Sequence, residues 1–283
     1  MTVSSAELFR SCSKQLEGIY GAQEAGAISF LLLENLFSLS RTEILADKKL
    51  EIEEKKERLS HSIDRLRHNE PIQYILGQTE FYGLPILVNP SVLIPRQETE
   101  ELVQLIISEH ENKKNSSILD IGTGSGCIAI ALKKALPQSA VYAMDVSEQV
   151  LSMAKKNAEL NKVEIQFLEK NILLPETTLP ETTIIVSNPP YVLQSEKKEM
   201  KENVLAHEPH LALFVEDSDP LLFYRTIVEK AKKYLLKDGS LYFEINEQFG
   251  KETIKLLTDT GFTEVRSWKD LNRKDRMIRA KKI

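Results

Sequence analysis

The residues Asn188, Pro189, Pro190 and Tyr191 could together hold a planar, weakly nucleophilic NH2 group. They follow the apolar run 182–186, which predicts a buried strand with this loop at its carboxyl end. The Asn188 side-chain carbonyl can accept one N–H, and Pro190 favours extended backbone at Pro189, which holds the Pro189 carbonyl ready to accept a second. Neither proline has a backbone N–H to compete for these acceptors, and Tyr191 offers a flat wall. An ordinary proline-rich turn that ends a strand is the alternative.

A second candidate stretch is rich in glycine. Residues 118–121 have the composition of a buried strand, and the turn Gly122-Thr123-Gly124-Ser125-Gly126 follows, before a helix. Glycines allow positive φ and a close ligand approach, while the free N–H groups of a helix N-terminus attract a carboxylate or phosphate. After the next predicted strand, Asp145 offers two oxygens where ribose hydroxyls would sit. This order favours an adenosine-containing ligand over a purely structural turn.

The spacing of the glycines narrows the choice of ligand. Gly-x-Gly-x-Gly differs from the dinucleotide pattern Gly-x-Gly-x-x-Gly, and no Gly-Lys-Ser/Thr follows to indicate a triphosphate loop. S-adenosylmethionine fits better, and it is an electrophile that a held NH2 group could attack. The two candidate stretches therefore support each other.

The elements that must position these loops follow a simple order. Residues 1–70 have helical spacing, residues 71–95 alternate short aromatic and β-branched runs with turn residues, and strands and helices alternate from 96 to 283. We predict an α/β fold with a doubly wound, mainly parallel, Rossmann-like sheet and an antiparallel strand near the end. A small all-helical domain that binds a partner and a β-hairpin linker would precede the sheet.

Composition bounds the remaining possibilities. The chain has 283 residues, a net charge of −5 and two distant cysteines, which match no zinc or redox spacing. We expect a soluble cytoplasmic protein with no signal peptide, no membrane span and no nonspecific nucleic-acid binding. We expect no metal site, because Pro209 interrupts the His207–His210 stretch, and we expect Cys127 to be a packing residue. Arg96 and Glu98 could pair or approach the cofactor.

Motifs along nearly the whole chain resemble the protein N5-glutamine methyltransferases that modify peptide-chain release factors. The resemblance rests on Pro-Ile-Gln-Tyr-Ile-Leu-Gly at 71–77, Phe-Tyr-Gly at 81–83, Leu-Ile-Pro-Arg-Gln-Glu-Thr-Glu at 93–100, the stretches 120–126 and 188–191, and Glu208-Pro209 with Ala212-Leu213. It implies a class I methyltransferase domain, S-adenosylmethionine as cofactor, and methylation of the Gly-Gly-Gln glutamine of class I release factors.

The resemblance also implies roles for individual residues. Residues Gly122, Thr123, Gly124, Ser125 and Gly126 would line the methionine part of the cofactor, Asp145 would hold its ribose, and Asn171 with Ile172 would lie near its adenine. Asn188, Pro189, Pro190 and Tyr191 would receive the glutamine, with Asn188, Pro189 and Tyr191 as the catalytic group. The chain departs from the family pattern at four places: Asn171 for Asp, Gln97 for Pro, residues 214–220 for a glycine-rich stretch, and Asn246 for Gly.

Two alternatives use the same motifs differently. An adenine-N6 methyltransferase of DNA or RNA would present an exocyclic amine to the loop at 188–191, but no basic target-reading domain is evident. A noncatalytic adaptor would keep the fold and bind a partner through residues 1–70.

Overall fold

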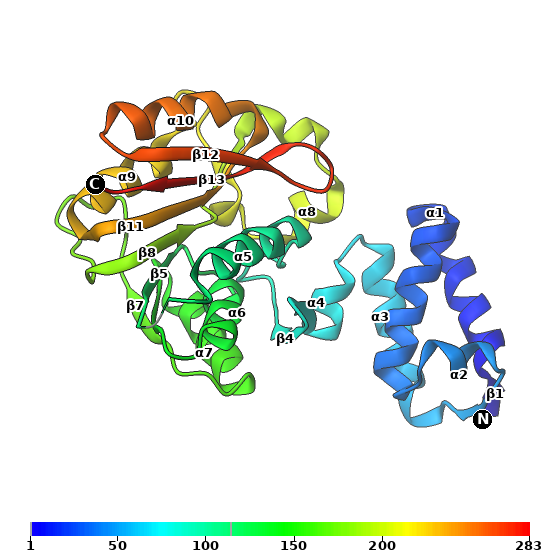
Figure 1. Ribbon diagram of the computed structural model, residues 1–283. Coiled ribbons are helices and arrows are strands. Elements are labelled where there is room, and N and C mark those ends of the chain that lie inside the picture. The colour runs from blue at the N-terminus through cyan, green and yellow to red at the C-terminus, as the bar shows by residue number, and fades with distance from the viewer. Residues whose placement is uncertain (1, 114) are drawn as a thin grey trace. The chain divides into compact units, whose positions relative to one another are not determined.

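The computed structural model describes residues 2–113 and 115–283, and the chain divides into two compact units. One unit extends to residue 77 and includes residues 201–207, and the other consists of 78–200 and 208–283 (Figure 1). The division predicted at residue 70, the linker over 71–95 and the partner-binding role of residues 1–70 stay predictions. Among the described helices, none combines the length and apolar composition that crossing a bilayer requires.

The first unit is mainly helical. Its helices are α1 (Ser5–Phe37), α2 (Arg41–Leu45), α3 (Lys56–Arg67), α4 (Ile72–Leu76) and α8 (Glu202–His207), with a 3-10 turn η1 (Glu53–Lys55). The side chains of Ser4 and Ser40 cap α1 and α2, and α1 bends where Gly21 adopts a positive φ of 76°. Apolar faces of α1 and α3 form one core that includes Leu16, Leu32 and Leu66.

Two local predictions for the first unit and its edge are wrong. Lys49–Glu51 (β2) pairs antiparallel with Thr2–Ser4 (β1) and is not helical, because only its central residue, Leu50, is buried, as strand alternation requires. Residues 72–76 form helix α4 and no part of a hairpin, since Pro71 precedes the helix and Gly77, with φ of 75°, ends it. The hairpin itself is β3 (Gln78–Phe81) and β4 (Leu84–Leu87).

The second unit contains a seven-stranded sheet in the order β12-β13-β11-β8-β5-β6-β7. Its strands are β5 (Ser117–Ile121), β6 (Ala140–Asp145), β7 (Gln166–Glu169), β8 (Thr182–Ser187), β11 (Leu235–Glu244), β12 (Thr263–Lys269) and β13 (Asp275–Lys281). Strands β7, β6, β5, β8 and β11 are parallel, and β13 is antiparallel to both β11 and β12. The predicted α/β class with a doubly wound, mainly parallel sheet is confirmed.

Helices cover both faces of this sheet (Figure 1). They are α5 (Gln97–His110), α6 (Cys127–Ala135) and α7 (Glu148–Leu160) on one face, and α9 (Leu222–Tyr234) and α10 (Gly250–Asp259) on the other. Short elements complete the unit: a parallel pair β9 (Val192–Leu193) and β10 (Phe214–Val215), and the 3-10 turns η2 (Gln194–Glu199), η3 (His210–Ala212) and η4 (Glu247–Phe249).

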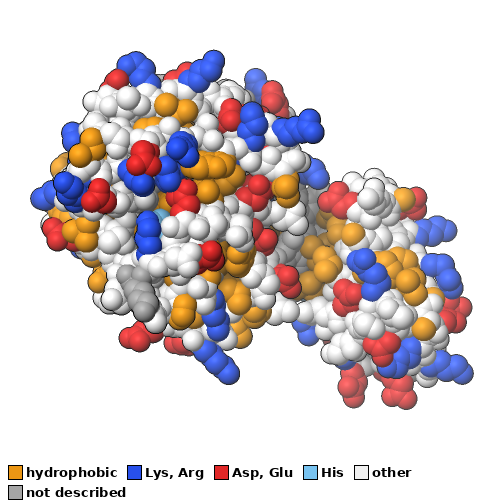
Figure 2. Space-filling model, viewed as in Figure 1, with side chains coloured by type: hydrophobic (Ala, Val, Ile, Leu, Met, Phe, Trp, Pro, Cys, Tyr) orange, Lys and Arg blue, Asp and Glu red, His pale blue; other side chains and the backbone are white. Residues whose placement is uncertain are grey.

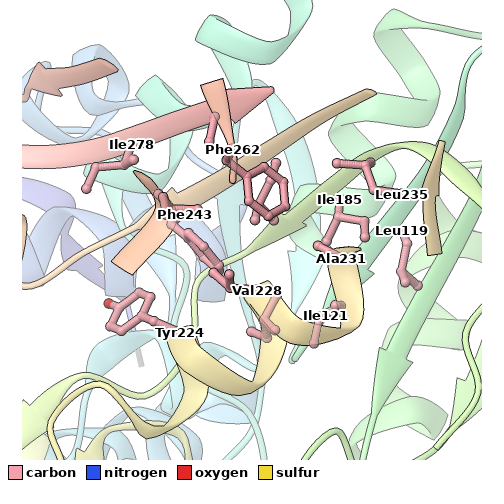
Figure 3. Close-up of a cluster of buried hydrophobic side chains, with 14 of the residues drawn as sticks. Leu119, Ile121, Ile185, Tyr224, Val228, Ala231, Leu235, Phe243, Phe262 and Ile278 are labelled. Atoms are coloured by element: carbon pink, nitrogen blue, oxygen red, sulfur yellow. The ribbon is translucent and has the colours of Figure 1, made fainter. Parts of the chain in front are cut away.

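The core between the sheet and α9 holds the central strands rigidly. Figure 3 shows Tyr224 and Val228 of α9 beneath Phe243 of β11, and all three side chains are fully buried. Strand β8 is buried along most of its length because both of its faces are covered, which is typical of parallel sheets. The loops at the carboxyl ends of β5, β8 and β11 therefore start from fixed points.

Candidate active site

The two stretches that the sequence singled out meet at adjacent strand ends. Ile121 at the end of β5 pairs with Ser187 at the end of β8, and the Ser187 hydroxyl donates to the Ile121 carbonyl over 2.7 Å. The carboxyl end of β5 is a topological switch point of the sheet, since β6 lies beside β5 on one side and β8 on the other. Open α/β sheets bind ligands at such points.

A cavity of about 390 Å³ lies between the two loops, within the size range of small-molecule sites. Ten of the predicted site residues line it: Gly122, Thr123, Gly124, Ser125, Asp145, Asn171, Ile172, Asn188, Pro189 and Pro190. Two predicted site residues, Gly126 and Tyr191, are not among the lining residues.

The glycines of the turn have different structural uses. Gly122 and Gly124 have φ of 74° and 55°, and a Cβ added to either would enter open space. Gly126 has φ of 84°, but a Cβ there would lie 3.1 Å from the Ala154 Cβ, so this glycine allows α6 and α7 to pack closely. The first two glycines therefore leave room for a ligand, whereas the third permits helix packing.

Buried acids support the glycine-rich turn. The Thr123 hydroxyl donates to Asp120 Oδ2 over 2.6 Å, and the complete burial of Asp120 raises the pKa of its carboxyl to about 7. The Asp145 carboxylate accepts from the backbone N–H groups of Gly124, at 3.1 Å, and of Val146, at 2.8 Å. Burial also raises the pKa of Asp145, while these N–H groups oppose the increase. Asp145 thus has a fixed carboxylate at the cavity wall.

Asn171 and Ile172 lie at another part of the cavity wall. The Asn171 side-chain oxygen accepts from the Leu173 N–H at 2.9 Å, and the Asn171 backbone carbonyl accepts from the Thr177 hydroxyl at 2.5 Å. The Asn171 side chain therefore presents its NH2 group, a donor, where a family Asp would present a second acceptor.

The loop after β8 offers two acceptors. Within residues 2–113 and 115–283, neither the Asn188 side-chain oxygen nor the Pro189 carbonyl oxygen takes part in a hydrogen bond, and both residues line the cavity. The Asn188 NH2 group donates to the Thr99 hydroxyl at 3.2 Å. The two free acceptors could therefore bind the two hydrogens of an NH2 group.

Tyr191 lies behind this loop. Its hydroxyl donates to Glu244 Oε1 over 2.9 Å, and its ring packs against the core beneath the sheet. Burial and the neighbouring Glu244 raise the pKa of Tyr191 well above its ordinary value. The predicted contact of Tyr191 with a substrate stays a prediction, since the structure gives this side chain an interior partner.

The structure also brings to the site residues that were not among the predicted site residues. Arg96 lines the cavity and pairs with the buried Glu208 over 2.7 Å, not with Glu98. Asn157 of α7 is fully buried and donates to the Ser125 carbonyl at 2.9 Å. Both pairs join residues far apart in the sequence. The motif stretches 93–100 and 208–209 already pointed to Arg96 and Glu208, whereas no sequence signal pointed to Asn157.

The cysteines and histidines have ordinary surroundings. Burial raises the pKa of the Cys127 thiol to about 12, so this group stays protonated at neutral pH and is a poor nucleophile. His207 Nε2 lies 3.0 Å from the His68 carbonyl oxygen. The described residues contain no group of three or more His, Cys, Asp and Glu side chains arranged to hold a metal ion.

Comparison with known proteins gives consistent matches along the chain. Residues 7–77 match the PrmC N-terminal domain, and residues 89–212 match the methyltransferase small domain. A release factor glutamine methyltransferase of Flavobacterium psychrophilum is 50% identical over 268 residues, which cover 93% of this chain and 94% of that protein. One of the same description from Bacteroides thetaiotaomicron is 44% identical over 269 residues, which cover 94% and 96%.

A solved structure is similar in fold. The crystal structure of a methyltransferase from Pyrococcus furiosus superimposes with a TM-score of 0.52 at 18% identity, covering 79% of this chain and 98% of that one. At this identity the likeness concerns the fold alone.

Proposed function

Because this chain belongs to the family of release factor glutamine methyltransferases, we propose that it methylates a glutamine side chain of class I peptide-chain release factors. The methyl group would come from S-adenosylmethionine and would be added to the amide nitrogen, N5, of the Gly-Gly-Gln glutamine. The release factor is then the protein substrate and partner.

One observation carries this proposal. Asn188 and Pro189 line the same cavity as the glycine-rich turn, and the Asn188 side-chain oxygen and the Pro189 carbonyl have no hydrogen-bond partner among the described residues. A primary carboxamide has two N–H groups that match two such acceptors. The arrangement thus supports an NH2-bearing substrate beside a nucleoside ligand.

The cavity residues fit the cofactor. Gly122 and Gly124 leave open space beside the backbone, and Asp145 holds a carboxylate where ribose hydroxyls could donate to it. Ile172 supplies an apolar surface for adenine. When bound, S-adenosylmethionine supplies a methyl carbon attached to a positively charged sulfur.

The protein's part in the reaction is to position the amide. A carboxamide nitrogen is barely basic because its lone pair is delocalised. Acceptors at Asn188 and Pro189 would hold both hydrogens, fix the nitrogen's direction and favour the transition state, in which those hydrogens become more positive. Strong base catalysis is not required, since the nitrogen loses its proton easily once it has gained the methyl group.

The adenine-N6 alternative has less support. The full-length relatives at 44% and 50% identity are described as acting on release factors. On the face shown in Figure 2, Lys and Arg side chains are interspersed with Asp and Glu, in agreement with the net charge of −5. A noncatalytic adaptor would have no use for an open cavity with two free acceptors.

Mass spectrometry of release factor after incubation with this protein and S-adenosylmethionine tests the function. We expect one added methyl group on the Gly-Gly-Gln glutamine. We expect none on a release factor in which alanine replaces that glutamine. Parallel reactions with DNA and RNA test the alternative, and transfer to nucleic acid without transfer to release factor would refute the proposal.

A further inference from the structure

A buried hydroxyl group lies between the proposed acceptor residue and a buried carboxylate. Thr99 of α5 donates its only hydroxyl proton to Glu244 Oε2 at the end of β11, over 2.6 Å. The Asn188 NH2 group donates to the same hydroxyl oxygen over 3.2 Å. Thr99 is 3% exposed and Glu244 is 1% exposed, so water cannot readily replace either contact.

The direction of these hydrogen bonds follows from the number of protons. A threonine hydroxyl has one proton, and an ionised carboxylate can only accept. With its proton directed at Glu244, Thr99 can only accept from Asn188. The Asn188 amide must then turn its NH2 group toward Thr99 and its oxygen away from it, which leaves the oxygen available to the cavity.

The second oxygen of Glu244 also accepts a hydrogen bond. Tyr191 donates its hydroxyl proton to Glu244 Oε1 over 2.9 Å. Glu244 thus accepts from one residue at each oxygen, and Arg276 provides a nearby positive charge that favours its ionised form. Burial raises the pKa of Glu244, while the bonds from Thr99 and Tyr191 oppose the increase.

We propose that Thr99 and Glu244 are positioning residues for methyl transfer, because they fix which end of the Asn188 amide faces the substrate. This inference rests on the proposed function and adds two residues to it. With the amide turned over, Asn188 would direct N–H groups at the N–H groups of the substrate. This Glu244–Thr99–Asn188 hydrogen-bond relay, called the relay below, therefore selects a substrate that donates N–H groups, such as a primary carboxamide.

The test compares Thr99→Val, which removes the hydroxyl at nearly constant volume, with Thr99→Ser, which restores it. Thr253→Val is the matched control, since Thr253 is a fully buried threonine of the same unit whose hydroxyl donates to the carbonyl of Phe249, the N-cap residue of its own helix. Steady-state kinetics with release factor give kcat and KM, and calorimetry gives the Kd for S-adenosylmethionine.

We expect Thr99→Val to lower kcat by roughly 10- to 100-fold, less than the complete loss of an oriented transition-state hydrogen bond, because Asn188 itself is still present. KM for release factor and Kd for the cofactor should change by less than about twofold, because the relay acts on the transferred group and not on docking. Thr99→Ser should recover most of kcat, and Thr253→Val should match the wild type. A Thr99→Val enzyme as active as Thr253→Val, or a Thr99→Ser enzyme as impaired as Thr99→Val, overturns the proposal.

A second readout does not depend on activity. In ¹⁵N-labelled protein, the side-chain NH2 signals of Asn188 can be identified by their absence from Asn188→Ala. We expect Thr99→Val, but not Thr99→Ser or Thr253→Val, to shift these signals and to speed their exchange with water. Unchanged signals in Thr99→Val contradict the relay. A wild-type protein that transfers no methyl group contradicts the proposed function instead.

Discussion

Replacing Asn157 by alanine should both destabilise the second unit and weaken cofactor binding. The Asn157 side chain is fully buried and joins three elements. Its oxygen accepts from the Leu87 N–H at 2.6 Å, and its NH2 group donates to the carbonyls of Leu87 and Ser125, both at 2.9 Å. Asn157 of α7 thus ties the end of β4 to the glycine-rich turn.

The size of the effect follows from the number of lost bonds. Asn157→Ala leaves one N–H and two carbonyls of the backbone without their partner, at about 1 kcal/mol each. We therefore expect the free energy of unfolding to fall by about 3 kcal/mol. Water that enters the vacated space keeps the loss from being larger. Release of the Ser125 carbonyl should loosen the turn and raise the Kd for S-adenosylmethionine by about tenfold.

Asn161, which caps the C-terminal end of α7 one turn after Asn157, provides the matched control. Its NH2 group donates to the Pro85 carbonyl of the same hairpin at 2.8 Å and to the backbone carbonyl of Asn157 at 3.0 Å. Among the described residues, no hydrogen bond joins this side chain to the glycine-rich turn. Asn161→Ala should cost about 1–2 kcal/mol of stability and leave cofactor affinity unchanged. Urea unfolding measures the first quantity and calorimetry the second. The reasoning fails if Asn157→Ala loses less than about 1 kcal/mol, or if both variants weaken cofactor binding equally.

Three other perturbations test separate parts of the structure. Asn188→Ala removes one acceptor, so kcat should fall roughly 100- to 1,000-fold while calorimetry shows the cofactor still bound; nearly unchanged turnover would exclude Asn188 from catalysis. In Asn171→Asp, the new carboxylate can accept both from the Leu173 N–H and from an adenine amino group, so calorimetry should show a cofactor affinity about fivefold higher. Weaker cofactor binding by this variant would place the adenine elsewhere. Burial, with Lys113 nearby, lowers the pKa of His110 from 6.5 to about 4. Between these two pH values the unfolded chain therefore binds more protons than the folded chain. The stability that is present above pH 6.5 is lost as the pH falls toward 4. Between pH 7 and pH 5 the wild type should lose about 2 kcal/mol more than His110→Gln in urea unfolding, and parallel pH profiles would show that another group titrates.

The parts of the site that the sequence predicted are those determined by local backbone chemistry. Gly122 and Gly124 allow positive φ, and Pro190 restricts the residue before it, so both loops could be recognised from short stretches. Their meeting was predictable as well, because the carboxyl ends of neighbouring parallel strands share one edge of the sheet.

The pairing of the supporting residues could not be predicted because their partners are distant in the sequence. Thr99 and Glu244 are 145 positions apart, and Arg96 and Glu208 are 112 apart. Thr99, Glu208 and Glu244 look like ordinary polar residues until the fold buries them, whereas Arg96 stays partly exposed. The error at residues 72–76 has a different cause, since a five-residue apolar run fits a short helix as well as a strand, and only the flanking Pro71 and Gly77 favour the helix.

The glycine-rich turn and the 188–191 loop are supported in the same way, by a threonine hydroxyl that donates to a buried acid. Asp120, near the end of β5, accepts from Thr123 of the glycine-rich turn, and Glu244, at the end of β11, accepts from Thr99 beside Asn188. Both distances are 2.6 Å, and burial raises the pKa of both acids. A buried carboxylate is costly, but in its ionised form it only accepts, so it then fixes the direction of the hydroxyl bonded to it, whereas an amide in its place could turn over. Strands β5 and β11 flank β8, which carries the acceptor loop. The sheet thus places one such acid on each side of the loop that we propose holds the substrate nitrogen.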